Sequence, residues 1–332
     1  MKKILTLGLL GLATIGMLAG CAGGKEKVVI SGACEEERIA FMLPKLQEQF
    51  PEYDITFQYV GTGELVSKLQ GEGKNTEMDI FYDLDVCNAE MLLTENPSLF
   101  IELGDLVDKN VYVDGLYKDN TSFKYAVDIK TNVAILVNNK VLNQAGLTKP
   151  TSFQDLIKEE YKGNITIGNP KSSGTSYTII NGIASTMDAG NSDAYYEALN
   201  KNVKEYTTSG SAPIKSVNRG EVAIACGMLW QCVEFANENS DLSWFIPEEG
   251  SPYALYAMGI IDGHLNEATT KVFQYLFNDL NPQQVNKYAP DKIYKNQTTP
   301  EIPNYPTDFK EVSMKGLYDF KYKQNLLDNW KY

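Results

Sequence analysis

The most specific chemistry in the sequence lies in the ten residues from Gly168 to Tyr177, G-N-P-K-S-S-G-T-S-Y. They fall between a predicted strand and a predicted helix. Ser and Gly at a helix start leave backbone N–H groups free, and the helix dipole adds partial positive charge there. The hydroxyls of Ser172, Ser173 and Thr175 add further donors, so the segment suits an anion. An N-cap turn without a ligand would use the same residues, and both interpretations stay open.

Two more turns have the same donor-rich character. Residues 61–64 read G-T-G-E and follow the second predicted strand, and residues 209–211 read S-G-S. Because local dipoles act at short range, three such turns facing one cleft favour an anion even in an acidic chain. The sequence therefore predicts an anion cradle assembled from separate turns.

Catalytic and metal-binding side chains are sparse. His264 is the only histidine and lies in a turn-like D-G-H context, with no nucleophile or metal ligand spaced around it. Four cysteines follow Cys21 in the chain: Cys34, Cys87, Cys226 and Cys232. Their spacings match no zinc pattern, so we expect buried small side chains, with a Cys226 to Cys232 bridge as the open alternative. The sequence predicts no enzyme, no cofactor and no metal.

The N-terminus has the pattern of an export signal. Lys2 and Lys3 precede an apolar run over residues 4–18, which is too short to span a bilayer comfortably. Residues 18–21 read L-A-G-C, a lipobox in which the thiol of Cys21 receives a diacylglyceryl group. We predict a signal peptide over 1–20, a lipid-anchored linker over 21–27 and an extracytoplasmic, membrane-anchored protein. An ordinary signal peptide with an incidental cysteine is the alternative.

The overall charge limits the partners. The chain carries a net charge of −13, and losing Lys2 and Lys3 with the signal peptide makes it −15. Such a charge disfavours nucleic acids and anionic lipid headgroups as partners. No second apolar run approaches the roughly 20 residues of a membrane span.

Short apolar runs alternate with segments of helical period, which predicts βα units on a parallel sheet. The predicted pairs are 28–31 with 35–50, 55–60 with 64–70, 79–83 with 88–93, 164–168 with 175–187, and 222–226 with 229–237. Two further apolar runs, 131–137 and 254–261, read as long strands that cross between two α/β lobes. We predict lobe 1 over 28–130 plus 262–332, and lobe 2 with the hinge strands over 131–261. Residues 282–332 are expected to form loops and short helices that wrap a lobe.

Five segments, in order, resemble the ferric-iron and organophosphate branch of the substrate-binding proteins of bacterial ABC importers. They are 28–32 (V-V-I-S-G), 61–65 (G-T-G-E-L), 79–83 (D-I-F-Y-D), 161–165 (Y-K-G-N-I) leading into 169–175 (N-P-K-S-S-G-T), and 219–224 (R-G-E-V-A-I). The resemblance covers nearly the whole chain after the signal peptide. It implies an α/β, two-lobed type II periplasmic-binding fold with two hinge crossover strands, which closes on a solute and delivers it to a membrane permease.

The resemblance also bears on the ligand. Ferric binders of this branch typically carry adjacent tyrosines just after the strand that follows the Gly-Glu motif, and here residues 226–230 read C-G-M-L-W. Met228 and Leu229 stand at that place, and neither offers a hard oxygen ligand. Tyr195 and Tyr196 are adjacent, but they lie in a predicted amphipathic helix where one would pack and the other face solvent. The typical iron site is therefore missing.

What remains is a donor-rich cradle beside Met228, Trp230 and Tyr82, which suits a small organic anion. Glu64, Asp83 or Asp85 could receive an amine or sugar hydroxyls, whereas core packing is the alternative for each aromatic residue. The predicted ligand-binding residues are Ser31, Gly32, Thr62, Gly63, Glu64, Tyr82, Asp83, Ser172, Ser173, Gly174, Thr175, Ser211, Gly227, Met228 and Trp230.

Arg38 and the acidic residues beside it are harder to assign. Arg38 lies in the first turns of a predicted helix, near the cleft side of this fold, and is a candidate ligand contact. Glu35, Glu36 and Glu37 would favour the helix N-terminus, and would repel an anion if they pointed into the cleft.

The sequence thus predicts a monomeric binding lipoprotein for ABC import of a phosphorylated or phosphonate compound. Ferric uptake through a non-typical site is the first alternative. An exported enzyme on the same fold is a second, although no base and nucleophile pair appears by spacing. An adhesin or sensor that keeps the binding fold is the third.

Overall fold

The computed structural model describes residues 24–113, 116, 123–188, 191–298 and 300–332. The predicted signal peptide and the predicted lipid on Cys21 lie outside these residues. In the part of the chain that is described, no helix combines the length and the apolar character needed to cross a membrane.

Helices and strands alternate through most of the chain. The strands are β1 (Glu26–Gly32), β2 (Tyr53–Tyr59), β3 (Ile80–Asp85), β4 (Ala126–Asn138), β5 (Ile165–Gly168), β6 (Val203–Thr207), β7 (Ile224–Met228), β8 (Leu242–Phe245) and β9 (Tyr253–Ile260). The α-helices are α1 (Glu36–Gln49), α2 (Thr62–Glu72), α3 (Val86–Glu95), α4 (Asn139–Gln144), α5 (Gly174–Ser185), α6 (Asn191–Asn202), α7 (Ala212–Asn218), α8 (Leu229–Glu238), α9 (Glu267–Tyr275), α10 (Asn281–Tyr288) and α11 (Phe320–Asn329).

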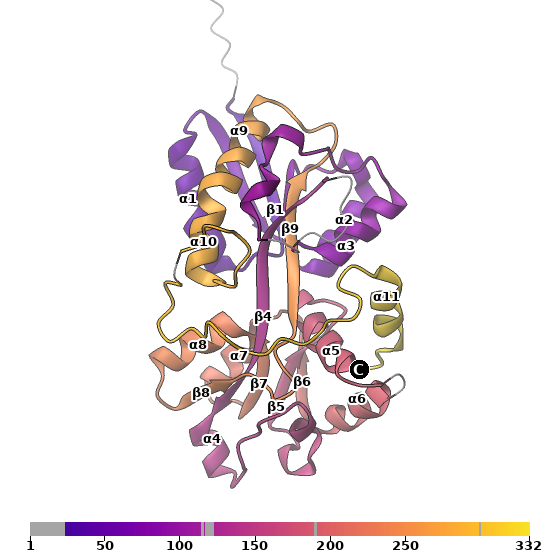
Figure 1. Cartoon of the computed structure of the whole chain (residues 1–332), viewed down its shortest axis with the longest axis vertical. Helices are drawn as coiled ribbons and strands as arrows, with labels where there is room; N and C mark the ends of the chain where they lie inside the picture. The colour runs from indigo at the N-terminus through magenta and orange to yellow at the C-terminus, as the bar shows by residue number, and fades with distance from the viewer. Residues whose placement is uncertain (1–23, 114–115, 117–122, 189–190, 299) are drawn as a thin grey trace, which may run out of the picture.

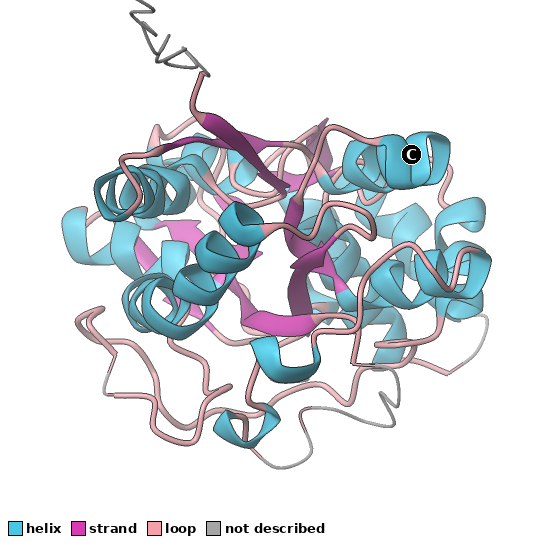
Figure 2. Ribbon diagram, turned by 90° about the horizontal axis from the view of Figure 1, so that it is seen from above, coloured by secondary structure: helices cyan, strands magenta, loops and turns pink. Residues whose placement is uncertain are grey.

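The strands form one mixed sheet in the order β2-β1-β3-β9-β4-β7-β5-β6, with β8 paired to β4. β1 is parallel to β2 and β3, and β5 is parallel to β6 and β7, as βα units require. Helices cover the strands on both sides when the molecule is seen from above (Figure 2). The predicted α/β class is confirmed, and the predicted strand and helix pairs all form, with ends that differ by a few residues.

Two long antiparallel strands join the halves of the molecule. The first part of β4, from Ala126 to Asn132, pairs with β9, and its second part, from Val133 to Val137, pairs with β7. β9 in turn pairs with β3. Figure 1 shows β4 and β9 side by side along the long axis, between an upper half that holds β1 to β3 and a lower half that holds β5 to β7. β4 therefore belongs to both halves, as expected of a crossover strand.

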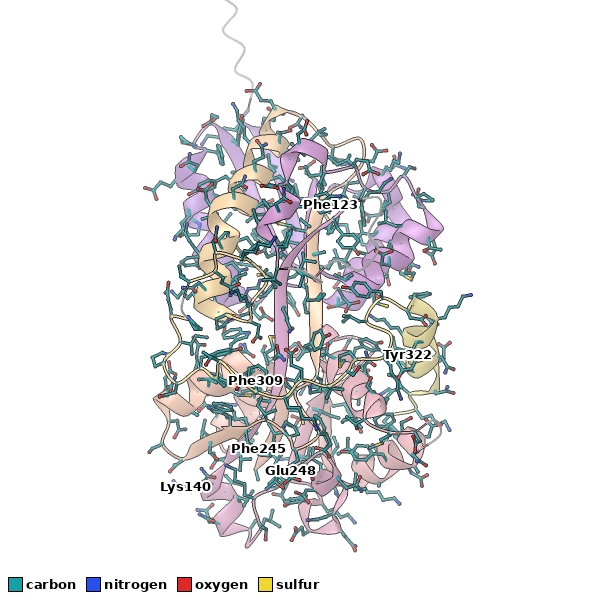
Figure 3. The ribbon with its side chains drawn as sticks, in the orientation of Figure 1. Phe123, Lys140, Phe245, Glu248, Phe309 and Tyr322 are labelled. Carbon is teal, nitrogen blue, oxygen red and sulfur yellow. The ribbon has the colours of Figure 1, made fainter. Side chains whose placement is uncertain are left out.

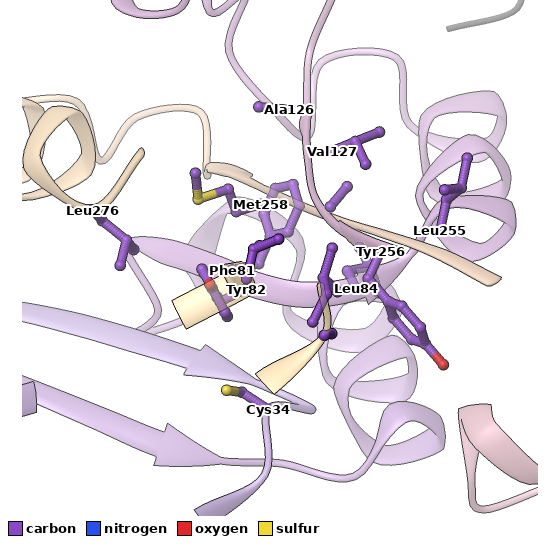
Figure 4. Packing of buried hydrophobic residues seen from close by; sticks show 14 of the residues in the cluster. Cys34, Phe81, Tyr82, Leu84, Ala126, Val127, Leu255, Tyr256, Met258 and Leu276 are labelled. Atoms are coloured by element: carbon purple, nitrogen blue, oxygen red, sulfur yellow. The ribbon is translucent and has the colours of Figure 1, made fainter. Parts of the chain in front are cut away.

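Apolar packing explains why these elements hold together. One cluster of buried side chains combines β1, β3 and β9 with the helices on them, and a second cluster fills the lower half around β5 and α5. Figure 4 shows Tyr82 among the packed side chains of the first cluster, and Tyr256 with its hydroxyl extended away from them. Cys34, Cys87, Cys226 and Cys232 are all buried free thiols, so Cys226 and Cys232 form no bridge here.

The C-terminal segment differs from the lobe assignment that the sequence favours. It crosses β4 and β9 near Phe309 and ends in α11, which carries Tyr322 and lies beside α5 and α6 (Figures 1 and 3). Trp330 belongs to the second cluster, where its ring lies 5.3 Å from that of Tyr196. The sequence pattern assigns residues 262–332 to lobe 1, yet Trp330 and Tyr332, directly after this helix, pack on the second cluster, whereas Phe320 at its start packs against the first.

The same helix also touches the upper half. Lys323 Nζ lies 2.8 Å from Asp85 Oδ1, and both side chains are 6% exposed. Asp85 is the N-cap of α3, where its Oδ1 accepts a hydrogen bond from the N–H of Asn88. The ammonium group also lies 4.4 Å from the centre of the Tyr177 ring on α5. α11 therefore bridges the two halves through one buried cation.

Candidate ligand-binding cleft

A cavity of about 260 Å³ lies between the halves, where helix N-termini from both of them converge. It is close to the lower end of the volumes usual for small-molecule sites. The lining residues are Ala33, Glu35, Glu36, Glu37, Arg38, Tyr59, Thr62, Asp83, Thr131, Ser172, Ser173, Gly174, Thr175, Ser209, Gly210, Ser211, Lys215, Met228 and Tyr256.

One wall of the cavity is the turn between β5 and α5. Ser173 is the N-cap of α5, and its hydroxyl oxygen accepts a hydrogen bond from the N–H of Ser176 at 3.3 Å. The N–H groups of Ser172 and Ser173 are bound to the carbonyl of Asn169. The next two, on Gly174 and Thr175, have no hydrogen-bond partner among the described residues. These two donors stand at the positive end of a helix dipole and line the cavity.

The turn at 209–211 packs directly against that helix start. A Cβ atom placed on Gly210 would lie 2.5 Å from Thr175 Oγ1 and 3.0 Å from Ser173 Oγ. Only glycine lets this backbone come so close to the two hydroxyls. The hydroxyls of Thr175 and Ser211 have no hydrogen-bond partner within the described part of the chain. The wall therefore presents several unpaired donors over a small area.

The opposite wall comes from the start of α1 and is built from charges. The guanidinium of Arg38 is 1% exposed and forms a bidentate pair with Asp83, with Nη2 lying 3.0 Å from Oδ1. It also donates to Glu35 at 3.0 Å and to Gln284 at 2.8 Å. Burial opposes the charge of Arg38, but the Asp83 carboxylate beside it raises the pKa of Arg38 well above its ordinary value. The guanidinium of Arg38 thus donates mainly to protein partners, and few of its N–H groups remain for a ligand.

Asp83 is fixed by its backbone as well as by Arg38. Its φ of 53° lies in the left-handed region, which is uncommon for a residue other than glycine. Its N–H donates to Asp128 Oδ2 at 2.9 Å, which holds that conformation in place. Asp128 is fully buried, and burial, followed by the nearby Asp83, raises its pKa well above the ordinary value. The buried carboxyl group of Asp128 thus helps to hold Asp83 in its place in the charged wall.

The two halves touch across the cavity. A Cβ on Gly63 would lie 2.8 Å from the carbonyl oxygen of Lys171, and one on Gly174 would lie 3.0 Å from Thr62 Oγ1. On another side, Lys215 of α7 lies 3.5 Å from a carboxylate oxygen of Glu37 on α1. The structure therefore shows the two walls in contact, with the cavity between them.

Eight of the predicted ligand-binding residues line this cavity. They are Thr62, Asp83, Ser172, Ser173, Gly174, Thr175, Ser211 and Met228. Gly63 lines a neighbouring cavity of about 170 Å³, which shares Thr62, Ser173 and Gly174 with the first. Six predicted residues line neither cavity: Ser31, Gly32, Glu64, Tyr82, Gly227 and Trp230.

The two aromatic residues among these six pack in the core. Tyr82 is fully buried, its hydroxyl donates to Asn281, and its ring lies 5.4 Å from that of Phe57. Trp230 is 3% exposed and packs edge to face on Tyr288 with 5.6 Å between ring centres. Core packing, the alternative for both residues, describes what the structure shows.

The two glycines among the six serve strand packing. A Cβ on Gly32 would lie 2.0 Å from the carbonyl oxygen of Tyr82, on the neighbouring strand β3. A Cβ on Gly227 would lie 2.1 Å from Ile214 Cδ1. Each glycine thus makes room for a neighbour in the protein, and this explains its presence without a ligand.

Sequence reasoning missed part of the site. It did not single out Ala33, Tyr59, Thr131, Lys215 and Tyr256, and it left Glu35, Glu36 and Glu37 unassigned; Arg38 was a candidate contact, and Ser209 and Gly210 lay in a predicted donor turn. The position of Glu35, Glu36 and Glu37 in the sequence could have indicated that they line the cleft. They begin the helix directly after β1, and the carboxyl end of β1 faces the cleft. Tyr256 lies within a crossover strand whose sequence is apolar throughout, so the sequence does not indicate which of its side chains face the cleft.

The structure gives little support for a typical iron site. Tyr195 and Tyr196 are 4% and 3% exposed, and their hydroxyls donate to the carbonyls of Phe153 and Ile180 at 2.6 Å. The expectation that one of them faces solvent was wrong, because both hydroxyls find partners in the second core. One group of potential metal ligands is present among the described residues, consisting of Cys34, Glu35 and Asp83. Arg38 already pairs with both of its carboxylates.

The fold and the cleft between the halves define the class: a two-lobed binding protein of the periplasmic-binding type. Residues 99–305 match the model of the bacterial extracellular solute-binding protein family, and the chain belongs to that family. A protein of Haemophilus influenzae is 26% identical over 236 residues, which cover 67% of this chain and 64% of that protein. The matched part thus spans less than two thirds of that relative's length.

Solved structures show the same fold. The periplasmic binding protein AfuA from Actinobacillus pleuropneumoniae, with exogenous fructose-6-phosphate bound, has a TM-score of 0.77 and 21% identity, covering 92% of this chain and 98% of that chain. Ferric ion-binding protein A from Pasteurella haemolytica, in its apo form, has a TM-score of 0.71 and 15% identity, covering 92% and 96%. A periplasmic thiamin binding protein has a TM-score of 0.77 and 14% identity, with the same coverage of 92% and 96%.

Proposed function

We propose that this protein captures a small organic anion, carrying a phosphate or phosphonate group, in the cleft and delivers it to an ABC permease. The observation that carries the proposal is the pair of unpartnered N–H groups on Gly174 and Thr175 at the start of α5. Free N–H groups at a helix N-terminus are a general anion site. Here the hydroxyls of Ser173, Thr175 and Ser211 stand beside them.

A phosphate or phosphonate group fits this wall better than a carboxylate does. It offers three oxygens in a compact tetrahedron, and each oxygen accepts more than one hydrogen bond. The wall presents donors from two separate turns, 172–175 and 209–211, in close contact through Gly210. The fructose-6-phosphate in the similar AfuA structure supports the same choice. Met228 and Tyr256 add apolar and aromatic surface for the rest of the solute.

The lipid on Cys21 is part of the proposal. A diacylglyceryl group at Cys21, after removal of residues 1–20, would hold the binder at the outer face of the membrane. The linker 21–27 is short, so the bound protein would stay within a few nanometres of its permease and its effective concentration there would be high. Metabolic labelling with a radioactive or clickable fatty acid, compared between the wild type and Cys21→Ala, tests the anchor separately from the ligand.

The ligand is tested first by what copurifies. Native mass spectrometry of the gently purified protein should show a bound mass that is released on unfolding and contains phosphorus. In thermal-shift screening, sugar phosphates or aminoalkylphosphonates should raise the melting temperature, because a ligand stabilises the state that it binds. A flat response to all phosphorus compounds, beside a clear response to ferric salts, would overturn the proposal.

The donor role of the α5 start is tested by comparing Gly174→Pro with Gly174→Ala. Both changes add a Cβ in the same place, and only proline removes the N–H. Gly174 is the first residue of α5, where proline is well tolerated, and Ser173 before it has the extended conformation that proline requires. We expect the proline variant to bind the solute roughly 10- to 100-fold more weakly than the alanine variant, as loss of one charge-assisted hydrogen bond predicts. Equal affinities would place the anion elsewhere.

Ferric iron remains the second candidate, on the grounds of the group formed by Cys34, Glu35 and Asp83, whose ligand atoms lie within 4.8 Å of one another. To bind a ferric ion there, the carboxylates would have to leave Arg38, which lies between them. Addition of ferric salt should give no charge-transfer colour in the wild type. A visible band that disappears in Asp83→Asn would favour iron.

A further inference from the structure

The two walls of the cleft have opposite electrostatic character. The wall at 172–175 and 209–211 presents N–H and O–H donors, whereas the wall at α1 presents carboxylates. Four carboxylates line the cavity, on Glu35, Glu36, Glu37 and Asp83, against the two cations of Arg38 and Lys215, which leaves a net charge of −2. A solute that carried only negative charge would be repelled by half of the site.

The carboxylates are not all paired within the protein. Arg38 serves both Asp83 and Glu35, and Lys215 lies near Glu37. Glu36 has no ion-pair partner among the described residues, although it lines the cavity. One wall therefore keeps negative charge that the protein itself does not neutralise.

An aromatic ring stands at the same wall. Tyr59, at the end of β2, lines the cavity and is 49% exposed, which is unusual for so large a side chain in this molecule. Partial burial, followed by the negative charges of Glu35, Glu36 and Glu64, raises the pKa of Tyr59, so the ring stays neutral beside them. A neutral ring next to carboxylates is a favourable setting for an ammonium group, through cation–π attraction.

Hydroxyls without a protein partner make the site suitable for a polar ligand. Thr62, Thr131 and Thr175 line the cavity, are 7 to 8% exposed, and have hydroxyls without a hydrogen-bond partner in the described part of the chain. A hydroxyl that faces a cavity without a protein partner can donate to, and accept from, a polar ligand. They come from both halves and from the crossover strand β4, so a ligand in the cavity would satisfy groups on every side.

We infer that the solute is a zwitterion, with a phosphate or phosphonate group at one end and an ammonium group at the other. The inference rests on the proposed function and specifies its substrate class. The anionic end binds the N–H groups of Gly174 and Thr175. The ammonium end lies against Tyr59 and Glu36. The charged wall, which disfavours a solute that carries only negative charge, then becomes the part of the cleft that selects the solute.

The test compares solutes that differ at one end. Titration calorimetry with 2-aminoethyl phosphate and 2-hydroxyethyl phosphate isolates the ammonium group, since the rest of the two molecules is the same. We expect the amine to bind at least 10-fold more tightly. Choline phosphate and 2-aminoethylphosphonate extend the comparison to a quaternary ammonium and to a carbon–phosphorus bond, and ethanolamine tests the cation without the anion.

A variant pair assigns the preference to the charged wall. Glu36→Gln should reduce the preference for the amine at least threefold, and it should raise the affinity for 2-hydroxyethyl phosphate because it removes a negative charge from the wall. Glu48→Gln, at the exposed far end of the same helix, is the matched control and should keep the wild-type preference.

The outcomes separate the two proposals. Equal affinity for the amine and the alcohol overturns the zwitterion inference and leaves the phosphate site standing. Binding of ethanolamine with no binding of any phosphorus compound overturns the proposed function itself. A preference for the amine that survives Glu36→Gln overturns the assignment to this wall.

Discussion

The two walls of the cleft differ in the chemical groups that they present to a solute. The wall at 172–175 and 209–211 offers backbone N–H groups and short hydroxyls, which the start of α5 positions locally. The wall at α1 offers long charged side chains, whose positions depend on partners far away in the sequence, such as Asp83 and Gln284 for Arg38. The first wall is set by a turn, and the second by tertiary packing.

This difference has a consequence for how each wall responds to mutation. Backbone donors survive most side-chain substitutions, so damage to the donor wall should change affinity with little effect on stability. Charged partners in a buried network support one another, so damage to the charged wall should change stability first. Measuring affinity and stability on the same variants therefore separates the two walls.

Arg38→Met should give the largest loss of stability. It would leave Asp83 and Glu35 buried without their cation, and breaking a buried ion pair in this way typically costs about 3 to 5 kcal/mol. Urea unfolding followed by circular dichroism measures the loss. Arg219→Met is the control, because Arg219 pairs with Glu221 and donates to Ser216 at the surface, where its side chain is 56% exposed. An equal drop in both variants would contradict the view that the charged wall is a structural network.

Thr175→Val should affect binding and leave folding nearly intact. The change removes a hydroxyl that faces the cavity and keeps the shape of the side chain. We expect the affinity for the phosphorylated solute to fall by about 1.5 to 3 kcal/mol, the range for hydrogen bonds to charged groups. Thr186→Val, at the other end of α5, removes a hydroxyl that donates to Ile183 instead, and should bind like the wild type. A larger change in stability than in affinity would place Thr175 in the structural network.

Asp128→Asn should change how stability depends on pH. Burial, followed by the nearby Asp83, raises the pKa of Asp128 well above its ordinary value of 3.8. The folded state therefore keeps a proton that the unfolded state loses, and the free energy of unfolding falls as the pH rises from the unfolded pKa through the folded one. The wild type should lose stability over this range, and the amide variant, which has no proton to lose there, should lose less. Urea unfolding at a series of pH values from 4 to 9 measures both, and the same pH dependence in the two proteins would contradict this expectation.

Lys215→Met should have the smallest effect of the four. Its pair with Glu37 crosses the cleft, but the side chains are 40% and 47% exposed. Exposed pairs contribute about 0 to 1 kcal/mol and weaken with salt. We expect a less than fivefold change in solute affinity, measured by calorimetry, that disappears at high salt. A large effect that does not depend on salt would mean that Lys215 binds the solute itself.

The donor wall was predictable from sequence, and the reason is local. Strand, turn and helix start follow one another over residues 165–175, so the free N–H groups could be inferred from S-S-G-T alone. The long strands and the α/β class were predictable for the same reason, since each is a continuous pattern. The N-cap of α9 is equally local, because the side chain of Asn266 accepts a hydrogen bond from the N–H of Thr269, three residues later, at 2.7 Å.

The charged wall and the roles of the aromatic residues were not predictable in this way. Whether Tyr82 and Tyr256 face the core or the cleft depends on which side of a strand meets which neighbour, and both lie on strands buried on two faces. Such strands have continuous apolar sequences. They lack the alternation of polar and apolar residues that would show which side chains lie on which face of the sheet. The partners of Arg38 at Asp83 and Gln284 are 45 and 246 residues away, a distance over which no local pattern acts.

The contacts of α11 with both halves mean that the C-terminal helix would resist any motion that separates them. Any motion that separates α3 from α5 either pulls Lys323 away from Asp85 or pulls α11 away from the core that holds Trp330. Opening the cleft would then require breaking contacts outside it, made by Lys323 and Trp330, which do not line the cavity. The release of cargo to a permease would therefore depend on the last helix, and a tag or truncation at the C-terminus would change how long the solute stays bound.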